Sequence, residues 1–132
     1  MEKEISHFWL GYFKNEEDFY DFVEEDERYY TEEENEDLYV SKFAESQHIQ
    51  WFDYDFVEYG FEEESLGIYE KFTDYSYADQ WLPAVERKIN EMGLETPVNA
   101  IIFTSRHVIP KPVSVNDEEY ALYYIGEIAY EI

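Results

Sequence analysis

The sequence contains no cysteine and few basic residues. Nine Lys and Arg side chains stand against 33 Asp and Glu, and the formal net charge is −24. Without cysteine there can be no disulfide, thiolate metal site or cysteine nucleophile, which fits a reducing compartment. No apolar run approaches the roughly 20 residues that cross a bilayer, and residues 1–4 lack the basic start and apolar stretch of a signal peptide. We therefore expect a cytoplasmic protein that binds neither nucleic-acid phosphates nor anionic membranes.

Aromatic residues are abundant, with ten Phe, fourteen Tyr and three Trp. So high a net charge is usually typical of disorder, but aromatic side chains build packed cores and interfaces. A chain of 132 residues is long enough to bury a core without disulfides or metals, and we predict a single domain over residues 1–132. The expected core residues are Phe8, Trp9, Phe19, Phe22, Trp81 and Phe103.

The order of apolar patterns predicts strands interleaved with helices. Asn15 is a suitable N-cap for a first helix, which we expect to end near Tyr29. Gly93 is a suitable C′ residue for a second helix. These elements predict an α+β two-layer sandwich, with a mostly antiparallel sheet and helices packed on one face. We expect strands at 5–13, 50–61, 98–104 and 121–130, main helices at 15–29 and 77–92 (with Pro83 near the first turn), short helical pieces at 41–49 and 66–72, and a loop or edge at 109–113.

The acidic residues are distributed unevenly along the chain. Residues 1–80 carry 25 acidic and 5 basic side chains, whereas residues 81–132 carry 8 and 4. Adaptation to high salt would spread the acids evenly over the surface, so this asymmetry indicates a face with a function. Residues 24–37 form the only low-complexity stretch, and for its part 32–37 a solvated segment without a partner remains the alternative.

No catalytic motif is evident. His7, His48 and His107 lack metal-binding spacing, and the sequence has no phosphate-binding glycine loop or serine nucleophile elbow. Asp53 and Asp55 fall on one face of a predicted strand, where a hydrolase could use them with a metal, but such a pair equally serves to bind an arginine. We predict no enzymatic activity, no cofactor and no metal site.

Acids and aromatics together favour a protein-binding surface. Charge steers a basic partner and speeds association, while desolvated Tyr and Trp side chains supply lasting affinity. We predict that Tyr29, Tyr30, Tyr54 and Tyr59 are exposed. The predicted partner-binding residues are Glu24, Glu25, Asp26, Tyr29, Tyr30, Asp53, Tyr54, Asp55, Glu58, Tyr59, Glu62 and Glu63.

Three blocks of the sequence resemble one known family. They are residues 7–13, with His7-Phe8-Trp9-Leu10-Gly11 followed by Phe13; residues 52–56, Phe-Asp-Tyr-Asp-Phe; and residues 124–130, Tyr-Ile-Gly-Glu-Ile-Ala-Tyr. In this order they resemble immunity protein 22 of bacterial polymorphic toxin systems. The resemblance implies a small cytoplasmic protein, encoded beside a secreted toxin, which binds the toxin domain and blocks it without catalysis or a cofactor.

Three functions therefore stay open from the sequence. The first is an inhibitor of a cognate toxin with a basic surface, for which a nuclease is the expected class, acting as a monomer when free. The second is a phosphate-mimicking inhibitor or adaptor of a host nucleic-acid-binding protein. The third is a hydrolase that uses Asp53 and Asp55.

Overall fold

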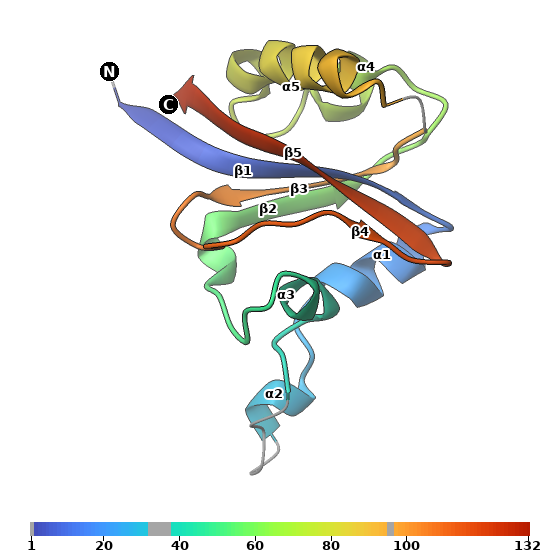
Figure 1. Ribbon diagram of the computed structural model, residues 1–132, viewed down its shortest axis with the longest axis vertical. Coiled ribbons are helices and arrows are strands. Elements are labelled where there is room, and N and C mark those ends of the chain that lie inside the picture. Colours follow the sequence, from blue (N-terminus) through green and yellow to red (C-terminus); the bar gives the residue numbers. More distant parts are fainter. Residues whose placement is uncertain (1, 32–37, 95–96) are drawn as a thin grey trace.

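An antiparallel sheet forms the centre of the computed structural model, which describes residues 2–31, 38–94 and 97–132 (Figure 1). Within these residues five strands lie in the order β2-β3-β1-β5-β4. The long strands β1 and β5 pair along their whole length and bring residues 3 and 131 side by side. The strands are β1 (Lys3–Phe13), β2 (Val57–Phe61), β3 (Ala100–Ser105), β4 (Val115–Asn116) and β5 (Tyr120–Glu131).

Helices cover both faces of this sheet (Figure 1). The α+β class and the antiparallel sheet are confirmed, but the expected placement of all helices on one face is wrong. On one face lie α1 (Glu16–Val23) and α3 (Lys42–Ser46), and on the other lie α4 (Ile68–Phe72) and α5 (Ala78–Met92), while α2 (Arg28–Thr31) stands away from the sheet.

The central strands need cover on both sides because their side chains are apolar on both sides. In β1, Trp9 and Phe13 belong to the core cluster beneath α1 and α3, whereas Phe8 and Leu10 belong to the cluster beneath α5. A strand buried on both faces has a continuous apolar run instead of an alternating one. Residues 5–13 have such a run, which was the signal for a second helical layer.

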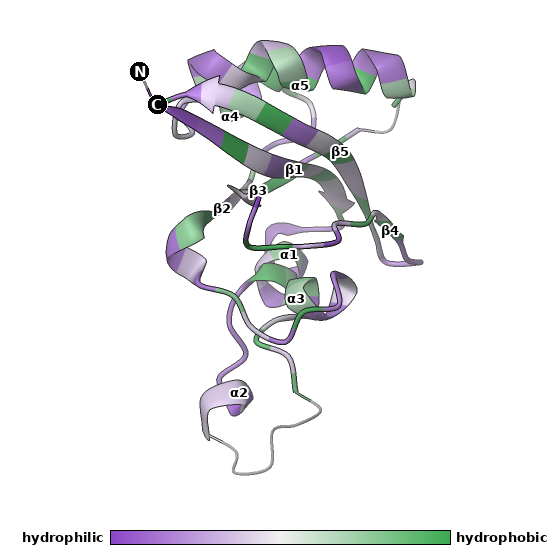
Figure 2. Cartoon of the chain, turned by 60° about the vertical axis from the view of Figure 1, so that its left-hand side comes forward, coloured by the Kyte–Doolittle hydropathy of each residue, from purple (hydrophilic) through white to green (hydrophobic). Residues whose placement is uncertain are grey.

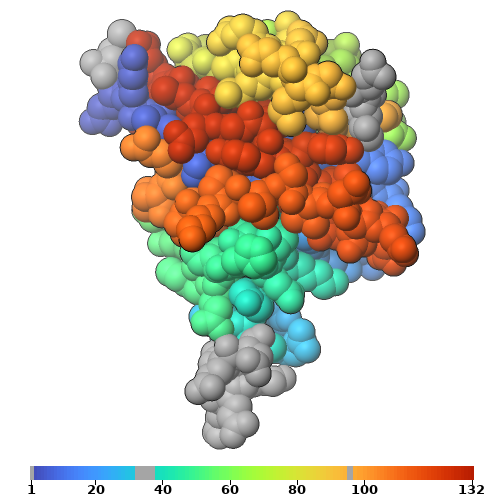
Figure 3. Space-filling view, in the orientation of Figure 1, coloured from blue at the N-terminus to red at the C-terminus, as the bar shows by residue number. Residues whose placement is uncertain are grey.

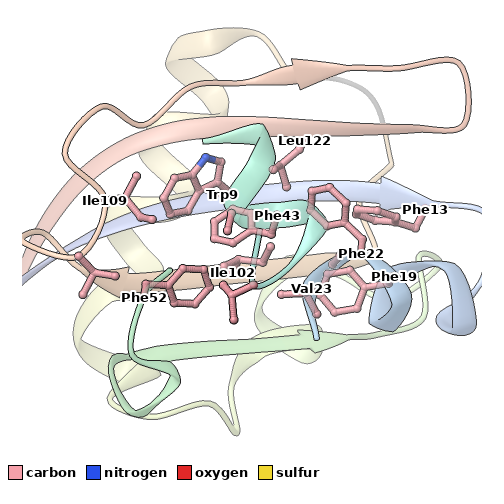
Figure 4. Packing of buried hydrophobic residues seen from close by; sticks show 14 residues of the cluster. Trp9, Phe13, Phe19, Phe22, Val23, Phe43, Phe52, Ile102, Ile109 and Leu122 are labelled. Carbon is pink, nitrogen blue, oxygen red and sulfur yellow. The ribbon is translucent and has the colours of Figure 1, made fainter. Parts of the chain in front are cut away.

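The predicted core is confirmed, since all six aromatic residues expected inside are buried. Figure 4 shows the cluster beneath α1 and α3, where the Trp9 ring meets Phe43 edge to face with centroids 5.1 Å apart. The indole N–H of Trp9 donates to the carbonyl of Val113 at 3.1 Å. Trp9 thus joins β1, α3 and the segment before β4.

Residues 109–113 form a loop that is fastened to α3. The Gln47 side chain accepts from the Val113 N–H at 2.8 Å and donates to the Val113 carbonyl at 3.0 Å. In Figure 3 the corresponding orange surface lies directly against the green surface of α3. Gln47 is buried, and this pair of bonds satisfies its amide away from water.

The sequence predicted the start of α1 and the end of α5 correctly, but not the end of α1 or the position of Pro83 within α5. Asn15 caps α1 by accepting the Asp18 N–H at 2.8 Å, and Gly93 ends α5 with a φ of 64°, as predicted. The first helix ends at Val23 instead of continuing to Tyr29. Pro83 lies inside α5 and not in its first turn. Figure 2 shows polar and apolar bands alternating along α5, as expected of a helix with one buried face.

The predicted strand at 50–61 is only partly correct. Residues 54–56 form a 3₁₀ turn, η1 (Tyr54–Phe56), and β2 starts at Val57. The Asp53 carboxylate accepts the N–H of Asp55 at 2.9 Å. A short acidic side chain that bonds to the nearby backbone competes with strand formation, which explains the late start of β2.

Among the helices that the structure describes, none is long and apolar enough to cross a bilayer. Residues 32–37, which include most of the acidic stretch discussed above, lie outside the described residues.

A half-buried phenol makes the stability of the fold sensitive to alkaline pH. The Tyr124 hydroxyl lies 2.8 Å from His7 Nδ1, and burial, followed by the charge of Glu127, raises the pKa of Tyr124 to about 12. Tyrosine in an unfolded chain ionises near pH ~10. The folded state therefore holds the proton longer, and this stabilisation is present below pH ~10 and decreases as the pH approaches 12.

We expect the urea concentration at the unfolding midpoint to decrease as the pH is raised from 9.5 to about 11.5. The tyrosinate absorbance of the folded protein should appear at higher pH than that of the unfolded chain. Burial also raises the pKa of Tyr20, Tyr59, Tyr120 and Tyr130, so Tyr124→Phe should flatten the profile without abolishing it. A midpoint independent of pH over this range would contradict the view that these phenols stay neutral in the folded state.

Candidate partner-binding face

Strand β2 is an edge strand, since it pairs with β3 alone among the described strands. Its residues divide between the two faces of the sheet, as period-two geometry requires. Val57, Tyr59 and Phe61 pack against the cluster beneath α1 and α3. Glu58 points to the side of the residues that precede α5, where its carboxylate accepts the Ser76 N–H at 2.9 Å.

A row of three tyrosines runs beside this edge. The ring centroids of Tyr20 and Tyr59 are 6.2 Å apart, and those of Tyr59 and Tyr54 are 6.5 Å apart. All three side chains are half-buried, and the Tyr54 hydroxyl donates to the carbonyl of Val23 at 2.7 Å. Because the core holds their rings, little side-chain entropy remains to be lost when a partner covers them.

Carboxylates surround this row of tyrosines. Burial is the largest cause that raises the pKa of Tyr59, and the charges of Glu24 and Glu25 raise it further. Burial likewise raises the pKa of Tyr20, with smaller contributions from Glu16, Glu62 and Glu24. Glu24, which follows α1, and Glu62, which follows β2, therefore both lie close to the phenol of Tyr20.

We call this surface the β2 face and define it as Tyr20, Glu24, Glu25, Tyr54, Tyr59 and Glu62. It draws on α1 and on the continuous segment of η1 and β2, which are distant in sequence and meet only through the fold. On its far side, the Tyr75 hydroxyl donates to Glu62 at 3.4 Å. A hollow next to it is lined by Tyr20, Asp21, Glu24, Glu25, Asp26, Ser41 and Lys42.

A second group of predicted residues lies on and around α2, away from the sheet (Figure 1). The Trp51 indole donates to the Tyr30 hydroxyl at 3.2 Å, and the rings of Tyr29 and Tyr30 meet edge to face. Asp26 accepts from Arg28 at 2.7 Å, and this hydrogen bond is the largest cause that lowers the pKa of Asp26. The ion pair offsets part of the negative charge of this group.

The exposure expected of the four tyrosines is only partly observed. Tyr30 is 55% exposed, as predicted, whereas Tyr29, Tyr54 and Tyr59 are half-buried and pack against the core. That expectation was wrong for these three because their rings cover the open side of the cluster beneath α1 and α3. The Tyr59 phenol nevertheless lies near the carboxylates of Glu24 and Glu25.

Asp53 and Asp55 do not form the strand-face pair that the sequence predicted. They lie at η1, where the Asp53 side chain is committed to the N–H of Asp55. Asp55 is exposed and shares a hollow with Glu58, and Glu63 is exposed in the turn after β2. Within the described part of the chain, no group of three or more His, Asp or Glu is arranged to hold a metal.

Two exposed aromatic residues were absent from the predicted set. Trp51 is 48% exposed and Phe56 is 49% exposed, and they lie on either side of Asp53. The alternation of residues 50–61 was imperfect, which was the available signal that this stretch is not one continuous strand. A turn there leaves both rings at the surface.

Comparison with known families identifies this chain. The family described as immunity protein 22 matches residues 6–131, so the chain belongs to that family, as its three sequence blocks indicated. No curated protein and no solved structure matches the chain significantly. Membership of an immunity family indicates a toxin-neutralising role.

Proposed function

We propose that this protein neutralises a cognate bacterial toxin by covering a basic surface of the toxin with the β2 face. The observation that supports this most directly is the arrangement of Glu24, Glu25 and Glu62 around half-buried tyrosines. The carboxylates that raise the pKa of Tyr59, after burial, are those of Glu24 and Glu25. A surface of this kind fits lysine and arginine side chains.

We further propose that the toxin domain is a nuclease. Enzymes that bind nucleic acid carry basic grooves for the phosphates, and a rigid array of carboxylates competes for the same groove. Steering by opposite charge speeds capture, and the fixed tyrosine rings supply the desolvated contacts that slow dissociation. Inhibition of this type needs neither catalysis nor a cofactor. We propose that it takes place in the cytoplasm and that the free inhibitor is a monomer.

Co-expression with the product of the adjacent gene tests this function. We expect the neighbouring product alone to arrest growth and degrade DNA or RNA, and an equimolar amount of this protein to restore both. A harmless neighbour, or one that stays toxic with this protein present, would contradict the proposal. Recovery of a housekeeping nucleic-acid-binding protein in a pull-down, without any toxin, would instead favour the phosphate-mimicking adaptor.

A further inference from the structure

The free edge of β2 offers backbone groups to a partner. In the pairing with β3, the N–H of Glu62 donates to Asn99 at 2.7 Å. Bonded positions alternate in antiparallel strands, so Gly60 and Glu58 also face β3 at the observed register. The N–H and C=O groups of Val57, Tyr59 and Phe61 therefore point outward, away from the sheet.

Both ends of this edge are already occupied. The Val57 N–H donates to the carbonyl of Tyr54 and closes η1. At the other end, the Tyr20 hydroxyl lies within hydrogen-bonding reach of the Phe61 backbone. Within the described residues, the backbone N–H of Tyr59 therefore remains as the donor that this edge can offer to a partner. The outward-facing carbonyls of β2 remain as acceptors.

Charge decides what can approach this edge. Glu58 belongs to β2 and Glu62 directly follows it. Glu24 and Glu25 lie near the ring of Tyr59. Acidic side chains on an edge strand discourage pairing with a second copy of the same acidic chain. The same side chains attract an extended segment that carries lysine or arginine, whose cations would also meet the outward carbonyls.

We propose that an extended basic segment of the toxin pairs with β2 at Tyr59 and adds a sixth strand to the sheet. This inference rests on the proposed function and specifies how the toxin binds. Main-chain hydrogen bonds in such strand addition supply affinity, and the flanking side chains supply specificity. The opposite edge is a weaker candidate, because β4 has only two residues.

Amide hydrogen exchange of the purified, co-expressed complex with the adjacent gene's product tests this pairing. In the free protein we expect the Tyr59 N–H to exchange quickly, because no partner in the sheet holds it. In the complex its exchange should slow at least 100-fold. The Gly60 N–H faces β3 and serves as the internal control, since it should be protected in both states.

Substitution gives a second, independent readout. Tyr59→Pro and Tyr59→Val both remove the ring, but only proline removes the N–H, and an outward N–H on an edge strand is where proline is tolerated. We expect the proline variant to bind the toxin at least tenfold more weakly than the valine variant, at similar melting temperature. If Tyr59→Pro does not fold, hydrogen exchange alone decides.

The outcomes separate this inference from the proposed function. A toxin that binds tightly while Tyr59 stays unprotected, or that protects Val115 and Asn116 of β4 instead, would overturn the strand pairing and leave toxin neutralisation intact. A neighbouring product that does not bind at all would remove both.

Discussion

Reversing the charge of Glu24 and Glu25 is expected to slow association with the toxin by roughly tenfold or more, while the dissociation rate changes less. Both residues are exposed at the end of α1, and their carboxylates lie near Tyr59. Steering acts at a distance, before contacts form, so its loss appears mainly in the association rate. Stopped-flow binding of the Glu24→Lys, Glu25→Lys double variant measures this.

The matched control reverses two acids at the other edge of the sheet. Glu118→Lys with Glu119→Lys changes the net charge equally, and both residues are exposed beside β4 and β5. We expect a much smaller effect from this pair, because the effect of charge decays over a Debye length of about 8 Å at 0.15 M salt. Equal slowing in the two double variants would show that the total charge, and not the β2 face, attracts the toxin.

Salt provides a further check on the same variant. The association rate of the unaltered protein should fall steeply with ionic strength, and the Glu24→Lys, Glu25→Lys variant should show a shallower dependence. An association rate insensitive to salt would argue against electrostatic capture at this face.

The second large effect concerns stability, where Trp9→Ala is expected to lower the free energy of unfolding by about 3–5 kcal/mol. The Trp9 side chain is fully buried, packs on Phe43 and donates to the carbonyl of Val113. Its removal leaves a cavity and deprives the Val113 carbonyl of one of its two donors, the other being the Gln47 side chain. Domains of this size are typically stable by only about 5–15 kcal/mol, so the loss is a large share of the total.

Trp51→Ala is the matched control, because it removes the same side chain from the surface. Trp51 is 48% exposed and its bond to the Tyr30 hydroxyl lies in an exposed setting. We expect less than about 1 kcal/mol of destabilisation in urea unfolding. A similar loss in both variants would mean that the two tryptophans do not occupy such different environments.

Several features of the fold could be predicted from the sequence because they depend on neighbouring residues. The cap at Asn15, the stop at Gly93 and the apolar run of β1 are local signals, and the structure confirms them. The six core aromatics were identified for the same reason, since each lies on an apolar face of its own element.

The candidate site was harder to predict because it depends on contacts between distant segments. The sequence marked Glu24 and Glu62 as candidates, but it could not show that the residues after α1 and those after β2 come together at the phenol of Tyr20. The sequence placed Asp53 and Asp55 on a strand. The hydrogen bond from the Asp55 N–H to the Asp53 side chain, which prevents this, cannot be recognised from the spacing of apolar residues. The sequence prediction also missed Trp51 and Phe56, whose exposure follows from that turn.

The sequence alone determined the charge, the α+β class and the family, since composition and local pattern carry these properties. Tertiary structure alone decided that helices cover both faces, that β2 lies at an edge and that Tyr59 turns its backbone outward. These properties depend on strand order and register. Both are fixed by burial of apolar surface contributed from across the whole chain, and no window of neighbouring residues contains that information.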